Sequence, residues 1–153
     1  MRFEFSAGGI VYKKNPSASS GPAKIKILVA QHSQHHGWVF PKGLIGDNPS
    51  TGSGRRETKK EAALREVEEE TGVIGKIIKP LVPVTYWYVF EKEKIKKTVY
   101  YFLMKYVSGD ISKHDMEMEN VEWIDLSEVE KKLTYKSDKQ VWQETKKQLA
   151  TNR

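Results

Sequence analysis

Hydrophobic and polar positions alternate over several short runs of the chain, which is the pattern of strands with one buried face. Two runs of this kind, residues 7–14 and 24–33, lie near the N-terminus, and the second begins with lysine alternating with isoleucine. Other runs rich in β-branched and aromatic residues predict further strands at 38–43, 82–90, 98–107 and 121–126. The run 38–43 is expected to stop at Pro41.

A helical period replaces this alternation at residues 56–71. Ala63 and Val67, with Leu64 on a neighbouring strip, are predicted to pack inward, and Gly72 is a suitable C-terminal stop. This predicts one long central helix.

Two helices are predicted to finish the chain. Ser127 with Glu130, and Ser137 with Gln140, have the spacing of capping boxes. Because helices and strands interleave without a break, the sequence predicts a single α/β (α+β) domain over residues 1–153.

Two segments interrupt this pattern. Residues 15–22 and 48–55 both read Asn-Pro-Ser and later Ser-Gly, which is turn and linker composition. We interpret them as related, short, flexible insertions at loop positions, where extra length has a small entropic cost.

The composition suits a globular protein with one core: 153 residues, 38% hydrophobic and 30% charged. The absence of cysteine excludes disulfides, thiol catalysis and cysteine-bound zinc. No run approaches a membrane span and the first residues lack a signal region, which predicts a cytoplasmic protein without membrane contact. The net charge of +6 suits polyanionic partners, although its lysines are scattered as on an ordinary solvated surface.

Three carboxylates share one face of the predicted central helix. Glu66, Glu69 and Glu70 stand at i, i+3 and i+4, so they repel one another unless a cation lies between them. Mg2+ prefers oxygen ligands and shares substrate phosphates, and Mn2+ is an alternative. The alternative interpretation is a solvated acidic face, in which Arg65 pairs with Glu69 and Glu68 points away.

The neighbouring residues resemble the Nudix hydrolases. In that family a glutamate is followed, after seven residues, by Arg-Glu-aliphatic-x-Glu-Glu-x-Gly-aliphatic, and Glu57 followed by residues 65–73 has this form. The stretches "AGGIV" and "WVFPKG" are also similar to the family's first strand and to the approach to its motif. One spacing differs from the family pattern: thirteen residues separate Gly43 from Glu57, whereas the family has five between the corresponding glycine and glutamate. The excess of eight residues is the length of segment 48–55.

The resemblance implies a Nudix-type α/β/α sandwich with a mixed β-sheet and a loop–helix motif. It also implies metal-dependent hydrolysis of a nucleoside diphosphate linked to another moiety. Glu66 and Glu70 are then the main metal ligands, and Glu69 is a ligand or the base that activates water. Arg65 is expected to orient a glutamate, and Glu57 to brace the loop or Arg65.

Other predicted site residues lie outside the helix. Lys42 is a candidate phosphate contact, and Gly43 permits close backbone approach. In several Nudix enzymes the loop before a late strand carries an additional base or ligand, a position held here by Glu117 and Glu119, and spacing leaves open which one acts.

His114 and Glu122 are expected to be solvated. The histidines 32, 35 and 36 are tempting zinc ligands, but histidines crowded in one hydrophilic turn are more often solvated, and no fourth ligand is evident.

The substrate is suggested by aromatic residues. Tyr86 and Tyr88 share a strand face opposite Trp87, so they are candidates for stacking a base. The stretch "LTYKSDKQVW", with Tyr135, resembles a turn of the diadenosine polyphosphate branch of the family. The expected substrate is therefore a dinucleoside polyphosphate.

Several alternatives stay open. They are hydrolysis of nucleoside triphosphates, pyrophosphate removal from RNA 5′ ends, a non-catalytic nucleotide sensor, and a basic RNA-binding domain with an acidic helix. No obligate protein partner is evident.

Overall fold

The fold is organised around its first strand, β1 (Arg2–Asn15), which runs parallel to the long strand β7 (Glu93–Gly109) from Arg2 beside Ile95 to Tyr12 beside Lys105. The computed structural model describes residues 1–15, 24–46 and 56–151; the predicted insertions 15–22 and 48–55, except Asn15, lie outside these residues. All other strand pairs are antiparallel, so the sheet is mixed.

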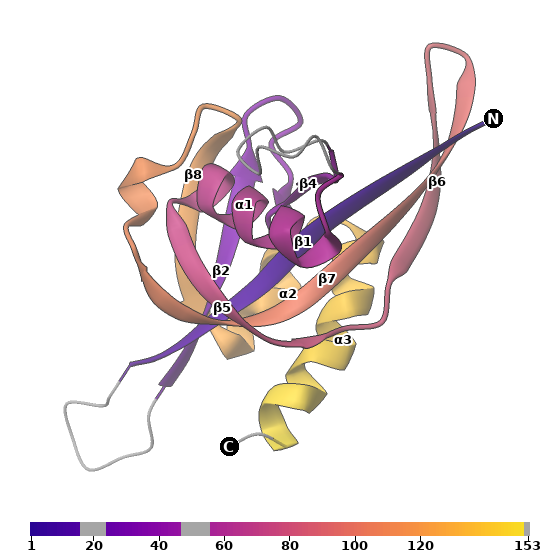
Figure 1. Cartoon of the computed structure of the whole chain (residues 1–153). Coiled ribbons are helices and arrows are strands. Elements are labelled where there is room, and N and C mark those ends of the chain that lie inside the picture. Colours follow the sequence, from indigo (N-terminus) through magenta and orange to yellow (C-terminus); the bar gives the residue numbers. More distant parts are fainter. Residues whose placement is uncertain (16–23, 47–55, 152–153) are drawn as a thin grey trace.

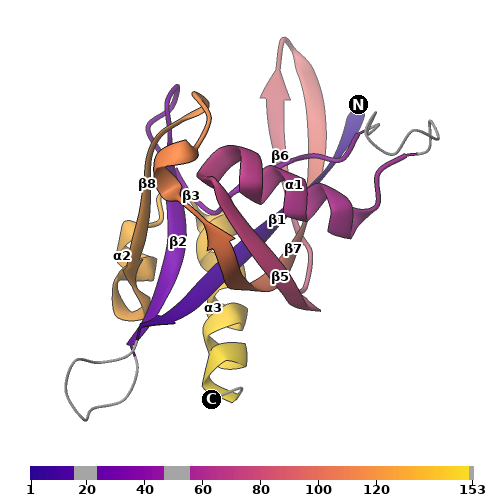
Figure 2. The same ribbon diagram turned by 60° about the vertical axis from the view of Figure 1, so that its left-hand side comes forward.

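Within the described residues, the remaining strands belong to the same sheet. They are β2 (Lys24–His32), β3 (Trp38–Val39), β4 (Lys42–Leu44), β5 (Val73–Pro80), β6 (Val84–Phe90) and β8 (Met118–Asp125). The helices are α1 (Lys59–Thr71), α2 (Val129–Lys132) and α3 (Lys136–Thr151), with 3₁₀ turns η2 (Ile111–Lys113) and η3 (Leu126–Glu128). Helix α1 covers one face of the sheet and α3 the other (Figures 1 and 2), which confirms the predicted sandwich.

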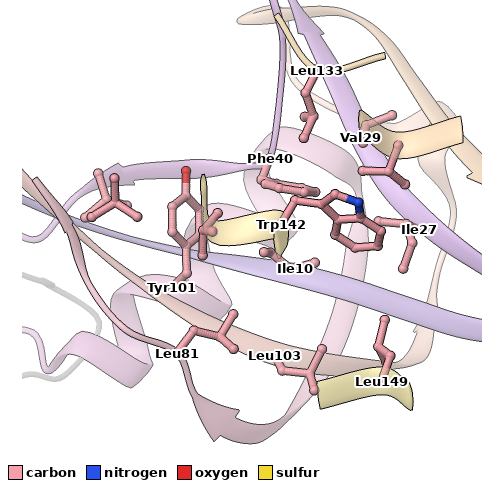
Figure 3. Close-up of a cluster of buried hydrophobic side chains, with 14 of the residues drawn as sticks. Ile10, Ile27, Val29, Phe40, Leu81, Tyr101, Leu103, Leu133, Trp142 and Leu149 are labelled. Atoms are coloured by element: carbon pink, nitrogen blue, oxygen red, sulfur yellow. The ribbon is translucent and has the colours of Figure 1, made fainter. Parts of the chain in front are cut away.

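Each face of the sheet has its own hydrophobic core. Alternation along β1 sends Ile10 toward the α3 side and Val11 toward the α1 side. On the α3 side Trp142 is almost fully buried and packs beside Phe40, with their ring centroids 6.2 Å apart (Figure 3). On the α1 side Val67 is fully buried.

The central helix begins three residues later than predicted. Thr58 forms a capping box with Glu61: its hydroxyl accepts from the Glu61 N–H at 3.1 Å, and its N–H donates to Glu61 Oε1 at 3.0 Å. The prediction that Leu64 packs inward is wrong, because Leu64 is exposed while Ala62 occupies the buried face. Gly72, at φ 79°, ends the helix in the left-handed region as predicted.

The short strand predicted to stop at Pro41 is β3, and a second short strand, β4, follows the proline. Other parts of the prediction need correction. The capping boxes at Ser127 and Ser137 are absent: α2 starts after Glu128 with no side-chain cap, and Ser137 lies inside α3. Strand β5 was not predicted, because the chain enters it directly after Gly72 with no loop to mark its start.

Two segments reach beyond the helices. The hairpin of β6 and β7 and the start of β1 extend together past the end of α1 (Figure 1). Thr85 pairs with Thr98 at the base of this hairpin, and Phe90 pairs with Glu93 at its tip.

The residues that flank 47–55 are held together. The Glu57 N–H donates to the Gly46 carbonyl at 2.9 Å, and the Gly46 N–H donates to Glu57 Oε1 at 3.3 Å. The ends of this segment are therefore fixed by contacts that do not involve residues 48–55.

Deletion of residues 48–55 is expected to preserve the fold. It makes Gly46, Asp47, Arg56 and Glu57 consecutive, so the existing Glu57–Gly46 hydrogen bond becomes the closing bond of a β-turn. Shortening the connection lowers its closure entropy by about 1 kcal/mol, which corresponds to a rise in Tm of about 2–4 °C. Thermal unfolding followed by circular dichroism measures this.

A variant with eight Gly and Ser residues at 48–55 is the length-matched control and should keep the Tm of the parent chain. A fall in Tm on deletion would show that the eight residues contribute stabilising contacts.

Candidate functional site

A cavity of about 570 Å³ lies where α1, β4, the start of β8 and the β6–β7 hairpin meet. Its lining includes four glutamates, two lysines, two tyrosines and two histidines, which are Glu4, Glu66, Glu70, Glu117, Lys42, Lys97, Tyr86, Tyr88, His32 and His35. Opposite charges therefore line one cavity.

The helical period places the α1 glutamates. At 100° per residue Glu70 lies 40° from Glu66 on the side of the buried Val67, whereas Glu69 lies 60° away on the other side. Glu66 and Glu70 are accordingly buried, and the Glu69 side chain is 51% exposed. The structure brings Glu66 and Glu70 into the cavity, whereas Glu69 is exposed and is not among the lining residues.

Strand β4 approaches these glutamates closely. The Lys42 N–H donates to Glu70 Oε1 at 3.2 Å. A Cβ at position 43 would collide with the Glu66 carboxyl group, so any larger residue there would have to displace that carboxylate. The close approach predicted for Gly43 is therefore made to Glu66.

Arg65 connects the carboxylates of the site. Its Nε and Nη2 donate to the two oxygens of Glu57 at 2.6 and 2.7 Å. Its Nη1 donates to Glu66 Oε1 at 2.7 Å and to Glu69 Oε2 at 3.2 Å. The hydrogen bonds from Arg65 hold the pKa of the buried Glu57 below its usual range, and the same pairing raises the pKa of Arg65.

The remaining acidic groups are poorly compensated. Burial first, and then the charges of Glu117 and Glu66, raise the pKa of Glu70 to about 9, against the opposing effect of Lys42. Burial also raises the pKa of Glu66, although Arg65 opposes it. This wall of the cavity favours a proton or a cation.

Of the two candidate loop glutamates, Glu117 lines the cavity. Its carboxylate lies 3.6 Å from His32 Nε2, and its carbonyl accepts from the Ser33 N–H at 2.9 Å. Glu119 instead pairs with His36 Nδ1 and is not among the lining residues.

Lys97 is a cavity residue that sequence reasoning missed. It lies between Ile95 and Val99, two core positions on the same face of β7. The two-residue spacing of these three positions could have predicted that the Lys97 side chain faces inward. Burial, and then the charge of Lys42, lower the pKa of Lys97. Lys42 and Lys97 are the two lysines that line the cavity, and Glu4, opposite Lys97 on β1, lines it as well.

Tyr86 and Tyr88 line the cavity together, with ring centroids 6.3 Å apart. Burial raises the pKa of Tyr86 to about 12, and the Tyr88 hydroxyl donates to Glu4. Both also line a second cavity of about 570 Å³, which shares Lys42 and Lys97 with the first.

Tyr135 lies in the second cavity beside Asp138, another residue that sequence reasoning missed. The Tyr135 hydroxyl bonds to His35 Nδ1 at 2.8 Å, and the same nitrogen accepts from the Gly37 N–H at 3.0 Å. Asp138 is buried and accepts from the Tyr101 hydroxyl at 3.2 Å.

His32 and His35 line the cavity, and the three histidines do not converge on a common point. The rings of His32 and His35 stack with centroids 4.3 Å apart, while His36 turns to Glu119. Burial, and then the neighbouring His32 and Lys42, lower the pKa of His35. Within residues 1–15, 24–46 and 56–151, no three acidic or histidine side chains are already gathered closely enough to hold a metal ion.

The donor chemistry nevertheless fits the magnesium ion predicted from the sequence. Glu66, Glu70 and Glu117 offer carboxylate oxygens, and burial, followed by repulsion from neighbouring glutamates, raises the pKa values of the first two. A cation would relieve this repulsion.

Comparison with known families identifies the fold. A family model described as the NUDIX domain matches residues 13–144. The chain therefore belongs to the Nudix family, which confirms the resemblance identified from its motif.

Curated relatives are similar over most of this chain. It is 32% identical over 142 residues to a protein named as mutator MutT4 of Mycobacterium tuberculosis, and 29% identical over 139 residues to the 8-oxo-(d)GTP phosphatase of Mycolicibacterium smegmatis. These alignments cover 90% and 88% of this chain, but 52% and 39% of the relatives. The chain thus spans about half or less of their length.

Solved structures agree on the fold. An Ap4A hydrolase of C. elegans in a binary complex is similar over 97% of this chain and 98% of that chain, with a TM-score of 0.71 and 26% identity. The NUDIX domain of Shewanella oneidensis NrtR, complexed with ADP ribose, covers 97% and 90% with a TM-score of 0.68. At 18% identity, that second likeness shows the shared fold alone.

In the described part of this chain, no helix has the length and apolar character needed to span a bilayer.

The Glu70→Gln substitution is expected to stabilise the chain in the absence of metal. With a raised pKa, folded Glu70 holds a proton that the unfolded chain has lost between about pH 4.5 and 9, so stability falls as pH rises through this window. The Tm of Glu70→Gln should therefore exceed that of the parent by an amount that grows from pH 5 to pH 9. Each kcal/mol corresponds to about 2–4 °C.

Glu68→Gln, on the exposed side of the same helix, is the matched control and should show no such trend. A Tm difference that does not change with pH would contradict the assignment of a proton to Glu70.

The Gly43→Ala substitution is expected to displace the Glu66 carboxylate while the domain stays folded. The added methyl group overlaps that carboxylate, whose side chain can rotate away. Titration with magnesium, followed by the increase in Tm, should show weaker binding than in the parent chain. An unchanged magnesium response would mean that Glu66 does not hold the ion.

Proposed function

We propose that this chain is a magnesium-dependent hydrolase of phosphoanhydride bonds in nucleoside diphosphate compounds, with dinucleoside polyphosphates as its best substrates. The observation that carries this proposal is the set of charges that line the first cavity. Glu66, Glu70 and Glu117 line it together with Lys42 and Lys97.

A polyphosphate repels nucleophiles through its own negative charge, so hydrolysis requires cations on its oxygens. Lys42 and Lys97 are proposed to bind those oxygens, and the burial of Lys97 strengthens its interaction with phosphate. Glu66 and Glu70 would hold Mg2+, which would neutralise phosphate charge and lower the pKa of a bound water.

Arg65 and Gly43 are positioning residues in this proposal. Arg65 fixes one oxygen of Glu66 at 2.7 Å, which leaves the other oxygen for a metal. Gly43 allows β4 to bring the Lys42 N–H and side chain beside the same glutamates. Glu57 anchors Arg65 through two hydrogen bonds.

Glu117 is proposed as the residue that accepts a proton from the attacking water. It lies in the cavity wall, where its charge is felt by Glu70 and Glu66, and no arginine holds it among its described contacts. Glu69, exposed and paired with Arg65, is the alternative base.

The second cavity supports the choice of a long substrate. A nucleobase stacked on Tyr86, Tyr88 or Tyr135 would lie beside the lysines that hold its phosphates. A similar chain, the C. elegans Ap4A hydrolase, has a name that agrees with this substrate class. The name of one curated relative, the 8-oxo-(d)GTP phosphatase of Mycolicibacterium smegmatis, favours nucleoside triphosphates as the second candidate.

The test is a hydrolysis assay on a substrate panel: diadenosine tetraphosphate, the common nucleoside triphosphates, 8-oxo-dGTP, ADP-ribose and 5′-triphosphorylated RNA, each with and without magnesium. Asymmetric cleavage of diadenosine tetraphosphate should give ATP and AMP as the preferred reaction. Glu70→Gln should lower kcat by about 10²–10³-fold, because a group that stabilises the transition state is lost.

Glu68→Gln is the control and should keep the activity of the parent chain. Preference for a triphosphate would move the assignment to the second candidate. Tight nucleotide binding without turnover of any substrate would show that the chain is a nucleotide sensor and not an enzyme.

A further inference from the structure

The two faces of the projecting strands differ in character. Glu4, Tyr88 and Lys97 point toward the cavity described above. Alternation places their neighbours on the opposite face, the one that α1 covers farther along the sheet. That face has no part in the proposed hydrolysis.

The opposite face is rich in exposed aromatic side chains and lysines. Phe3, Lys96 and Trp87 form one row across β1, β7 and β6, and Phe5 lies two residues along β1 from Phe3. The exposed fractions are 54% for Phe3, 40% for Phe5 and 48% for Trp87. We call these residues, together with Lys94, the aromatic–lysine face.

Lysine ammonium groups lie directly over the aromatic rings. The Lys94 and Lys96 ammonium groups lie 4.7 and 5.5 Å from the centroid of the Trp87 ring. Beside Phe5, a further cavity of about 660 Å³ is lined by Tyr100, whose ring centroid lies 4.0 Å from the ammonium of Lys59. Aromatic rings and lysine ammonium groups therefore lie together at two places on this face, at Trp87 and at Tyr100.

Large apolar side chains at such positions are unusual without a partner. Helix α1 starts at Lys59 and packs on the part of the sheet that holds Ala7 and Val11. Phe3, Phe5 and Trp87 are exposed. In Figure 1 the start of β1 and the β6–β7 hairpin, which carry them, extend past the end of α1.

Charge decides which partner fits. The strand positions on this face, from Phe3 on β1 to Tyr100 on β7, carry lysine but neither aspartate nor glutamate in the described residues. A symmetric pair of chains would place Lys94 and Lys96 against their own copies, which like-charge repulsion opposes. A polyanion with planar apolar groups satisfies both the lysines and the rings.

We propose that the aromatic–lysine face binds single-stranded nucleic acid. Bases stack on Phe3, Phe5 and Trp87, and the ammonium groups of Lys94 and Lys96 swing from the Trp87 ring to the phosphates. Two residues along β1 separate neighbouring rings by about 6.6–6.8 Å, and strands β1 and β6 lie about 9.5 Å apart across β7. Each ring therefore has room for its own base.

The test is fluorescence anisotropy with 3′-labelled 12-residue oligouridine and oligodeoxythymidine that carry 5′-hydroxyl ends, so that neither offers a phosphoanhydride to the cavity. The full chain is expected to bind both at 50 mM salt. Trp87→Ala should weaken binding about tenfold, and Trp87→Phe should retain most of the affinity, because the stacking surface remains. Tighter binding of oligouridine identifies RNA as the preferred ligand, and equal binding identifies any single strand.

The lysines give an independent measurement. The double substitution Lys94→Gln and Lys96→Gln should reduce the slope of log affinity against log salt by about 1.4, since each phosphate contact to a single strand contributes about 0.7. Lys131→Gln with Lys147→Gln, on α2 and α3, removes the same charge from other surfaces and should leave the slope almost unchanged.

Three outcomes would overturn the proposal. The first is that the parent chain does not bind the oligonucleotides at 50 mM salt. The second is that neither Trp87→Ala nor the Lys94 and Lys96 double variant changes the affinity. The third is that the chain forms a dimer that Trp87→Ala dissociates, and that it binds no oligonucleotide. Because the oligonucleotides lack phosphoanhydrides, these outcomes are independent of whether the chain proves to be a hydrolase.

Discussion

The site depends on one arginine fork. Arg65 binds both oxygens of Glu57, one oxygen of Glu66 and the carbonyl of Leu44, so a single guanidinium joins the loop, the helix and strand β4. Bidentate geometry fixes direction as well as distance. Lysine in place of Arg65 would supply the charge but not this fork, so it could not hold three elements in one arrangement.

The same hydrogen bonds make the geometry of the site independent of the length of the preceding loop. Glu57 is held by Arg65 on one side and by Gly46 on the other, so the segment between Gly46 and Glu57 begins and ends at fixed points. This explains how the chain accommodates thirteen residues between Gly43 and Glu57 where related motifs have five. The added length enters where closure entropy grows slowly, outside the contacts that order the carboxylates.

The site is also a source of instability. Burying Glu66 and Glu70 beside Glu117 disfavours their charged forms, and Lys42 compensates only in part. A chain selected for stability alone would place neutral or apolar residues there. Retaining these charges is consistent with a site that is complete only when a cation and an anionic substrate are bound.

Sequence periodicity predicted the parts of the site that are set by local geometry. The helical period put Glu66 and Glu70 on one face, and strand alternation put Tyr86 and Tyr88 together, because both patterns depend only on nearby residues. Periodicity did not separate Glu69 from the buried pair, since that depends on which side of Glu66 faces the sheet.

Tertiary contacts determine the rest. The choice between Glu117 and Glu119 follows from how the loop before β8 packs on the turn after β2, where Ser33 binds the Glu117 carbonyl. Lys97 enters the cavity because β7 is paired on both sides, with β1 and β6. Strand β5 was missed because its register depends on β7, two bulges included, and not on its own pattern.

Strand alternation also explains how one short stretch of chain can serve two surfaces. Consecutive residues Glu4 and Phe5 lie on opposite faces of β1, the first in the charged cavity and the second beside Tyr100. The two surfaces meet where β4 ends, because Leu44, its last residue, lines the first cavity and Ile45, the next residue, lines the cavity beside Phe5.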